Sequence, residues 1–586
     1  TATDTDYAQI EAGIAHEYFH NWTGNRITCR DWFQLCLKEG LTVFRDQEFS
    51  SDMRSRPVKR IADVRGLRAT QFVEDAGPLA HPVRPESYKE INNFYTSTVY
   101  EKGAEVVRMV QTLIGRKTFR AGMDLYFRRH DGEAATVEQF IQCFADVSNR
   151  NLTQFMRWYN QAGTPEVTVS GRYDAAHESY TVALRQSTPS TPDQPNKEPM
   201  VIPLAIGLVG ADGRDLPLRT QSDDVANSVL VRSESDATVE FTGISQKPIL
   251  SINRGFSAPI KLTTDLADDD LAFLAAHDND PFNRWQALQA IAMRLLIGDV
   301  AAVQAGRQPV SDDKLTGALG SILGDSRLKP AFVALALVPP GEGDIAREIG
   351  HDIDPDAVFM ARRAVRADIG NKLGPALATA YDRMAVPGPY SPDAESAGRR
   401  ALRNVALDLL AATGAREAVS RAARQFDMAD NMTDRLAALS TLSLCPGPDR
   451  ERALADFYGQ FASNALVIDK WFSLQAMTPH SDTLDQVRAL TAQAAFSFGN
   501  PNRVRALIGA FAANLTQFNR ADGAGYDFLA DTLLAVDPKN PQLAARLATA
   551  FRTWRTLERG RRAKAESALQ RVQAHPNLSR DLSDIV

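Results

Sequence analysis

Two histidines four residues apart, His16 and His20, constrain this chain more tightly than any other feature of its sequence. On a helix this spacing places both imidazoles on one face, one turn apart. Neutral imidazoles are good zinc ligands, and Glu39, which follows His20 after eighteen intervening residues, is the expected third ligand. Glu17 lies next to His16, where its carboxylate can reach a water without binding the metal. Three protein ligands leave a fourth position open, which is typical of a catalytic zinc site.

Two predicted helices carry these side chains. The first, over 7–22, has apolar residues at every fourth position: Ile10, Ile14, Tyr18 and Trp22. The second, over 35–49, carries Glu39, with Asp46 two turns further along the same face. Asp46 is a candidate to orient a zinc-bound histidine, but an ordinary solvated or capping role fits the sequence as well. The alternative for the whole motif is a surface helix whose histidines face solvent.

The sequence beyond the motif predicts a multidomain, mainly α protein. Residues 1–164 have mostly helical patterns. Residues 165–262 hold short β-rich runs separated by turn signals and predict a small β-sandwich. No set of catalytic side chains stands out in the sandwich, so its expected role is spacing. Residues 263–586 are rich in alanine and leucine and predict one-sided helices stacked into a superhelical array.

Charge, hydropathy and cysteine usage exclude several classes of function. A formal charge of −6 gives no general attraction to nucleic acid or anionic lipid. No run of eighteen consecutive apolar residues occurs, so no membrane span is expected. The four cysteines form no Cys-x-x-Cys pair, which favours free thiols in a reducing cytoplasm. The first residues lack a signal peptide and a starting methionine, and we expect a cytoplasmic chain cut from a longer one.

The residues around the histidines are more specific than their spacing. Six runs carry a likeness to a known family: HEYFHNWTGNR (16–26), KEGLT (38–42), NNFYT (92–96), TVYEKG (98–103), NPNR (500–503) and LIGAF (507–511). Through them the chain resembles the zinc-dependent aminopeptidase N family, in its bacterial alanyl branch. The resemblance implies a thermolysin-like catalytic domain in 1–164, one Zn²⁺ per chain, and a monomer that removes N-terminal amino acids from peptide substrates.

The resemblance also assigns roles to single residues. Tyr100 matches the family's catalytic tyrosine in its Tyr-x-Lys-Gly setting, although a tyrosine in an apolar segment is more often a core residue. The implied mechanism uses Glu17 to take and return a proton and Tyr100 to hold the oxyanion beside the zinc. More weakly assigned to substrate binding or to the surroundings of the metal are Lys38, Asp46, Asn92, Arg505 and Arg546. Without the resemblance, both arginines would be interpreted as solvated surface charges.

The family's Gly-x-Met-Glu-Asn motif, which binds the substrate's α-amine, does not occur in the fifteen residues before His16. Three hypotheses therefore stay open. The chain is an aminopeptidase represented by a fragment, with the N-terminal part of the same enzyme missing. Alternatively it is a gluzincin of other specificity, such as an endopeptidase or an epoxide hydrolase relative, or a non-catalytic helical scaffold that retains zinc. We expect the isolated chain to be poorly active and prone to aggregate.

Overall fold

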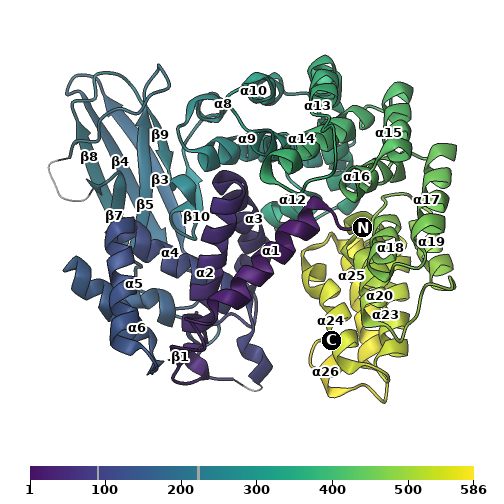
Figure 1. The fold of residues 1–586 in the computed structure, drawn as a ribbon, viewed down its shortest axis with the longest axis horizontal. Helices are drawn as coiled ribbons and strands as arrows, with labels where there is room; N and C mark the ends of the chain where they lie inside the picture. Colours follow the sequence, from purple (N-terminus) through teal and green to yellow (C-terminus); the bar gives the residue numbers. More distant parts are fainter. Residues whose placement is uncertain (89–90, 221–224) are drawn as a thin grey trace. The chain divides into compact units, whose positions relative to one another are not determined.

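The computed structural model describes residues 1–88, 91–220 and 225–586. The chain divides into two compact units. The first holds residues 4–291 and 392–394, and the second holds 1–3, 292–391 and 395–586. Figure 1 labels the helices and strands of both units. The predicted mainly α fold, with a β-sandwich between two helical regions, is confirmed.

The helical part of the first unit carries the histidine motif. Its helices are α1 (Asp4–Phe19), α2 (Leu35–Met53), α3 (Arg56–Asp75), α4 (Gly103–Ile114), α5 (Arg116–His130), α6 (Val137–Ser148) and α7 (Arg157–Asn160). A short π-helix, η3 (Thr98–Lys102), precedes α4 directly. Between α1 and α2, the two-residue strand β1 (Thr28–Cys29) pairs with β2 (Ala134–Ala135). Both helices predicted around the motif are present, with α1 ending at Phe19 rather than Trp22.

The apolar stripe predicted on α1 faces solvent. Ile10 is 55% exposed, Ile14 66% and Tyr18 69%, while Ala15 alone is buried among the residues of this helix. An apolar stripe at helical spacing normally packs against a core. The face of α1 that is opposite to its contact with α2 therefore leaves a row of large apolar side chains uncovered.

The β-sandwich follows the helical part within the same unit. Its strands are β3 (Glu166–Asp174), β4 (Ser179–Ser187), β5 (Ile202–Val209), β6 (Val225–Ala226), β7 (Val229–Arg232), β8 (Asp236–Thr242), β9 (Ile249–Ile252) and β10 (Lys261–Thr264). One sheet has the order β10-β3-β4-β8 and the other β6-β7-β5-β9. Strand β3 alternates buried Val167 and Val169 with exposed neighbours, as expected of a sheet with one covered face. The short helix α8 (Asp268–His277) follows the sandwich.

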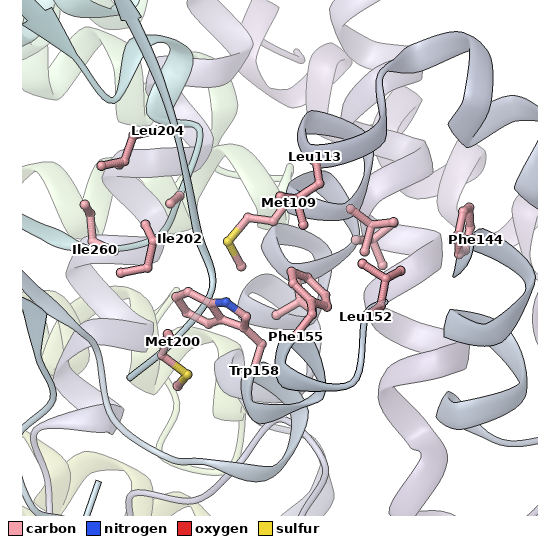
Figure 2. Close-up of a cluster of buried hydrophobic side chains, with 14 of the residues drawn as sticks. Met109, Leu113, Phe144, Leu152, Phe155, Trp158, Met200, Ile202, Leu204 and Ile260 are labelled. Atoms are coloured by element: carbon pink, nitrogen blue, oxygen red, sulfur yellow. The ribbon is translucent and has the colours of Figure 1, made fainter. Parts of the chain in front are cut away.

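The helical part and the sandwich share one hydrophobic core. Figure 2 shows Met109 and Leu113 of α4 beside Phe155 and Trp158, with sandwich residues such as Ile202 across from them. The Trp158 indole donates a hydrogen bond to the carbonyl of Val201 at 2.7 Å. A polar contact reinforces this core, because the Arg60 guanidinium binds Glu105 and also donates to the carbonyls of Gly255 (2.9 Å) and Phe256 (2.8 Å).

The second unit is a succession of helices. They are α10 (Asp313–Gly324), α11 (Pro330–Ala336), α12 (Glu342–Ile349), α13 (Pro355–Arg383), α14 (Ala394–Ala411), α15 (Arg416–Met428), α16 (Met432–Ser443), α17 (Pro448–Phe461), α18 (Ala465–Ala476), α19 (Thr483–Leu490), α20 (Pro501–Val504), α21 (Ala510–Ala513), α22 (Leu515–Phe518), α23 (Ala524–Val536), α24 (Pro541–Ala548), α25 (Arg559–Gln573) and α26 (Arg580–Ser583). Consecutive helices from α15 to α19 contact one another in turn, as in the predicted stacked array. Asn431 and Asn464 cap α16 and α18 through their side chains.

One helix in the described part of the chain, α9 (Pro281–Gln304), is long and apolar enough to cross a membrane by length and composition. This is weak evidence, because core helices of soluble proteins pass the same test, and 44% of its apolar window is buried in the structure. The expectation of no membrane span stays a prediction.

Candidate metal centre

Helices α1 and α2 pack against each other and bring the three predicted zinc ligands together. The Nε2 atoms of His16 and His20 lie 3.0 Å apart. Glu39 Oε2 is 3.4 Å from His16 Nε2 and 3.3 Å from His20 Nε2. Three donor atoms thus form a nearly equilateral triangle: one from α1, one from His20 directly after it, and one from α2.

This triangle fits a zinc ion. A tetrahedral zinc about 2.0–2.1 Å from each nitrogen and oxygen donor keeps its donors roughly 3.3 Å apart. The three separations, 3.0, 3.4 and 3.3 Å, agree with that value. Two imidazoles and one carboxylate are also a donor set that zinc uses in catalytic sites, where a fourth position stays open.

The other ring nitrogen of each histidine has an acceptor, which turns both Nε2 atoms inward. His16 Nδ1 donates to Asp46 Oδ2 at 2.8 Å, and His20 Nδ1 donates to the carbonyl of Thr23 at 3.1 Å. Such partners fix the ring orientation and the tautomer of a metal-binding histidine. The contact supports the orienting role that the sequence left open for Asp46.

Thr42 belongs to the same cluster and was not singled out from the sequence. Its hydroxyl lies 2.8 Å from the Thr23 hydroxyl and 3.4 Å from His20 Nδ1, and it is fully buried. A signal was available, because Thr42 and Asp46 follow Glu39 by three and seven residues and share its helix face.

Hydrogen bonds and charges within the cluster shift the pKa values of His16 and Glu39. The hydrogen bond to Asp46, with a smaller contribution from Glu39, raises the pKa of His16 to about 9 despite partial burial. Burial opposes the ionised form of Glu39, but hydrogen bonds from His16 and His20 lower its pKa to about 2. Without metal, a proton on His16 therefore neutralises part of the carboxylate charge, and zinc must displace that proton to bind.

Tyr100 belongs to the π-helix η3, and its side chain lies beside Glu39 of α2. Burial, followed by the charge of Glu39 and a hydrogen bond to it, raises the pKa of the phenol. The approach of the two segments depends on glycines, because a Cβ on Gly40 would lie 2.8 Å from the backbone carbon of Gly103. The backbones of α2 and α4 thus touch at residues that directly follow Glu39 and η3.

Glu101, the neighbour of Tyr100, is another residue that the sequence analysis did not single out. Burial raises its pKa to about 7, and repulsion from Glu74 and Asp46 adds to the shift. The sequence signal was weak: a glutamate in a run that the family likeness already includes.

The remaining predicted residues differ in their surroundings. Lys38 Nζ lies 3.5 Å from Glu39 Oε1, at the edge of the ligand cluster. Glu17 is exposed on α1 directly after His16. Asn92 is exposed in the 3₁₀ turn η2 (Ile91–Phe94), and its carbonyl accepts a hydrogen bond from the Tyr95 amide at 3.3 Å. Its place near a substrate cavity stays a prediction.

Arg505 and Arg546 lie in the second unit, and both are exposed there. Arg505 is the first residue of a second π-helix, η6 (Arg505–Gly509), and donates to Asn502 Oδ1 at 2.9 Å. Arg546 belongs to the last turn of α24. Their predicted contact with a peptide carboxylate stays a prediction.

Known proteins match this chain over its whole length. A model described as the peptidase family M1 domain matches residues 1–159, a domain of unknown function with an Ig-like fold matches 163–265, and one with ARM repeats matches 268–586. Aminopeptidase N of Caulobacter vibrioides is 48% identical over 586 residues, covering 100% of this chain and 66% of the relative. Aminopeptidase N of Escherichia coli is 44% identical over 584 residues, covering 99% and 67%.

Solved structures agree with these relatives. The crystal structure of Legionella pneumophila aminopeptidase A in complex with aspartic acid matches with a TM-score of 0.86 and 27% identity, covering 100% of this chain and 66% of that one. The chain spans about two thirds of the length of the relatives it matches.

Proposed function

The chain belongs to the aminopeptidase N family of M1 peptidases, and on that premise we propose that it is the zinc-binding part of an enzyme that hydrolyses N-terminal amino acids from peptides. The observation that carries this proposal is the triangle of donors from His16, His20 and Glu39. These residues would hold one zinc ion per chain. When bound, zinc supplies a Lewis acid that polarises the scissile carbonyl and brings the pKa of water toward about 7.

Glu17 is the proposed general base. It directly follows the ligand His16 in the last turn of α1. Its exposed carboxylate can take a proton from the attacking water and then return it to the leaving amine.

Tyr100 is the proposed oxyanion donor. Its raised pKa keeps the phenol protonated at neutral pH, so the hydroxyl donates a hydrogen bond where negative charge develops on the carbonyl oxygen. This hydroxyl is hydrogen-bonded to the ligand Glu39 and therefore lies next to the proposed metal centre. Lys38, whose ammonium is also near Glu39, adds positive charge at the same edge.

The test separates metal binding from chemistry in the complete, zinc-loaded enzyme. Glu17→Gln is expected to keep one zinc. Turnover of an alanine amide should fall by at least roughly 10²–10⁴-fold, the usual effect of a lost general base. Tyr100→Phe is expected to cost roughly 10²–10³-fold, again with zinc retained. Glu11→Gln on the same helix and Tyr126→Phe on α5 are matched controls that should leave turnover unchanged. Near-normal turnover of either site variant refutes the role assigned to that residue.

Specificity for a free amino terminus is a separate part of the proposal. Faster cleavage of an aminoacyl amide than of the same residue N-blocked supports an aminopeptidase. The reverse preference supports a gluzincin of other specificity, and bound zinc without turnover supports a non-catalytic scaffold. We further propose a cytoplasmic monomer that binds peptides and neither nucleic acid nor membrane, in keeping with the charge of −6.

A further inference from the structure

The segment that carries Tyr100 is a π-helix, a conformation that is rare and concentrated at functional sites. It is five residues long, from Thr98 to Lys102, and continues directly into α4. Thr98 and Lys102, the residues at its two ends, are each 1% exposed. Hydrogen bonds to α3 hold both ends of this segment and so bear on its conformation and on the direction of the phenol.

Glu74, in the last turn of α3, holds the beginning of this segment. Its Oε1 accepts a hydrogen bond from the Ser97 amide at 3.2 Å, and its Oε2 accepts one from the Thr98 amide at 2.9 Å. The Thr98 hydroxyl also donates to Oε2 at 3.0 Å. The carboxylate thus satisfies two amides that a helix start leaves without partners. Ser97 occupies the position where a serine often provides this cap, but its side chain makes no capping bond.

Asp75, the next residue, holds the other end. Its Oδ2 accepts hydrogen bonds from Lys102 Nζ at 2.8 Å and from the Thr164 hydroxyl at 2.8 Å. Lys102 Nζ also donates to the Gly163 carbonyl at 2.9 Å. The Asp75 and Lys102 side chains are both 1% exposed, so this pair is shielded from solvent and cannot exchange partners with it.

The position of these two carboxylates is unusual for a helix. The C-terminal turn of a helix carries partial negative charge and favours basic residues, so two successive acidic residues there are unfavourable by themselves. Their hydrogen bonds to η3 offset this cost, and a negative charge is favourable at the start of the helical segment that Glu74 caps. A local conflict of this kind is expected where a site depends on it.

We propose that Glu74 is a positioning residue for the reaction. It fixes the start of η3, while the Asp75–Lys102 pair fixes its end, so that Tyr100 is held toward Glu39. The inference rests on the proposed function of Tyr100 as oxyanion donor. Its proposed effect on the reaction is through the position of the phenol.

The experiment uses the complete, zinc-loaded enzyme with Glu74→Ala, the conservative Glu74→Gln, and Glu48→Ala as a matched control. Glu48 is also partly buried and joins helices, through Arg56 (2.8 Å) and Arg108 (2.6 Å). Glu74→Ala is expected to lower kcat by about tenfold to a hundredfold, as for a misplaced catalytic group, with zinc content unchanged and KM altered by less than about threefold. Glu74→Gln keeps one acceptor oxygen and should recover part of kcat, and the control should leave kcat within about twofold.

Two readouts separate positioning from a general loss of structure. In a Tyr100→Phe background, Glu74→Ala should lower kcat no further, because the group it positions is already gone. Amide hydrogen exchange of residues 97–102 should accelerate in Glu74→Ala and not in Glu48→Ala, with or without zinc. Equal effects of Glu74→Ala in both backgrounds, or unchanged exchange, would overturn the inference. Near-normal turnover of Tyr100→Phe refutes the proposed function instead, and the exchange rates still measure whether Glu74 holds the turn.

Discussion

The contact between Gly40 and Gly103 gives a prediction in which two opposing effects can be weighed. Replacing Gly40 by alanine inside α2 favours the helix by about 0.8–1.0 kcal/mol, because alanine restricts the unfolded chain more than glycine does. The added Cβ, however, would lie 2.8 Å from the backbone carbon and 2.9 Å from the Cα of Gly103. Neither atom can rotate away, since both belong to the backbone at the start of α4.

The steric effect should win. Overpacking a buried contact costs about 1–3 kcal/mol, and more where the neighbour cannot yield. α2 and α4 must separate, which loosens the buried contacts that Leu41 and Phe44 make in the shared core. We expect Gly40→Ala to lower the free energy of unfolding by up to roughly 2 kcal/mol, which is the steric cost less the helix gain, and to weaken zinc binding because Glu39 moves with the helix.

Gly66→Ala is the matched control. Gly66 lies inside the neighbouring helix α3 with nothing within 4 Å of an added Cβ. The same substitution there should stabilise the protein by up to about 1 kcal/mol. Urea denaturation of the two variants, together with zinc content after dialysis against a weak chelator, measures both effects. A Gly40→Ala variant at least as stable as the parent, with full zinc, would refute the argument from backbone contact.

Three further predictions address the metal, pH and the exposed helix face. Asp46→Asn should weaken zinc affinity by about 10–100-fold, because His16 loses its charged partner; competition with a chelator measures this, and unchanged affinity contradicts it. The pKa of Glu101 is raised to about 7, against 4.5 in the unfolded chain. As pH rises, the carboxyl group therefore loses its proton in the unfolded state before it does so in the folded state, and stability falls. Glu101→Gln should therefore stabilise the zinc-free protein above pH 7, by at most roughly 3 kcal/mol, with the gain vanishing toward pH 4.5; equal gains at both pH values would exclude this cause. Replacing Ile14 and Tyr18 by Gln should reduce aggregation of residues 1–586 in light scattering without changing zinc content, and undiminished aggregation would show that this face is not responsible.

Much of the ligand cluster could be predicted from the sequence because its signals are local. The spacing of His16 and His20 has a direct geometric meaning on a helix, and Asp46 shares a helix face with Glu39. The strands of the sandwich were also visible, since alternating patterns and turn residues depend on near neighbours.

Other features depend on contacts between distant segments and could not be predicted in this way. The π-helix of Tyr100 depends on Glu74, which is more than twenty residues earlier in the sequence. The Thr23 carbonyl that orients His20 belongs to the backbone, so the residue type at position 23 gives no indication of this contact. The family likeness assigned Tyr100 its role, but the likeness did not reveal what holds this residue in place.

The core shared by α4, Trp158 and the sandwich bears on how members of this family can be divided and recombined. A spacer can be exchanged for another of similar length, but residues 165–262 cover Met109 and Leu113 and supply carbonyl partners to Arg60. Removing them would uncover an apolar surface and leave a buried guanidinium short of acceptors. We therefore expect the helices that carry the metal centre and the sandwich to be kept together in any recombined chain. A permissible crossover point in a chimaera lies after the sandwich rather than before it.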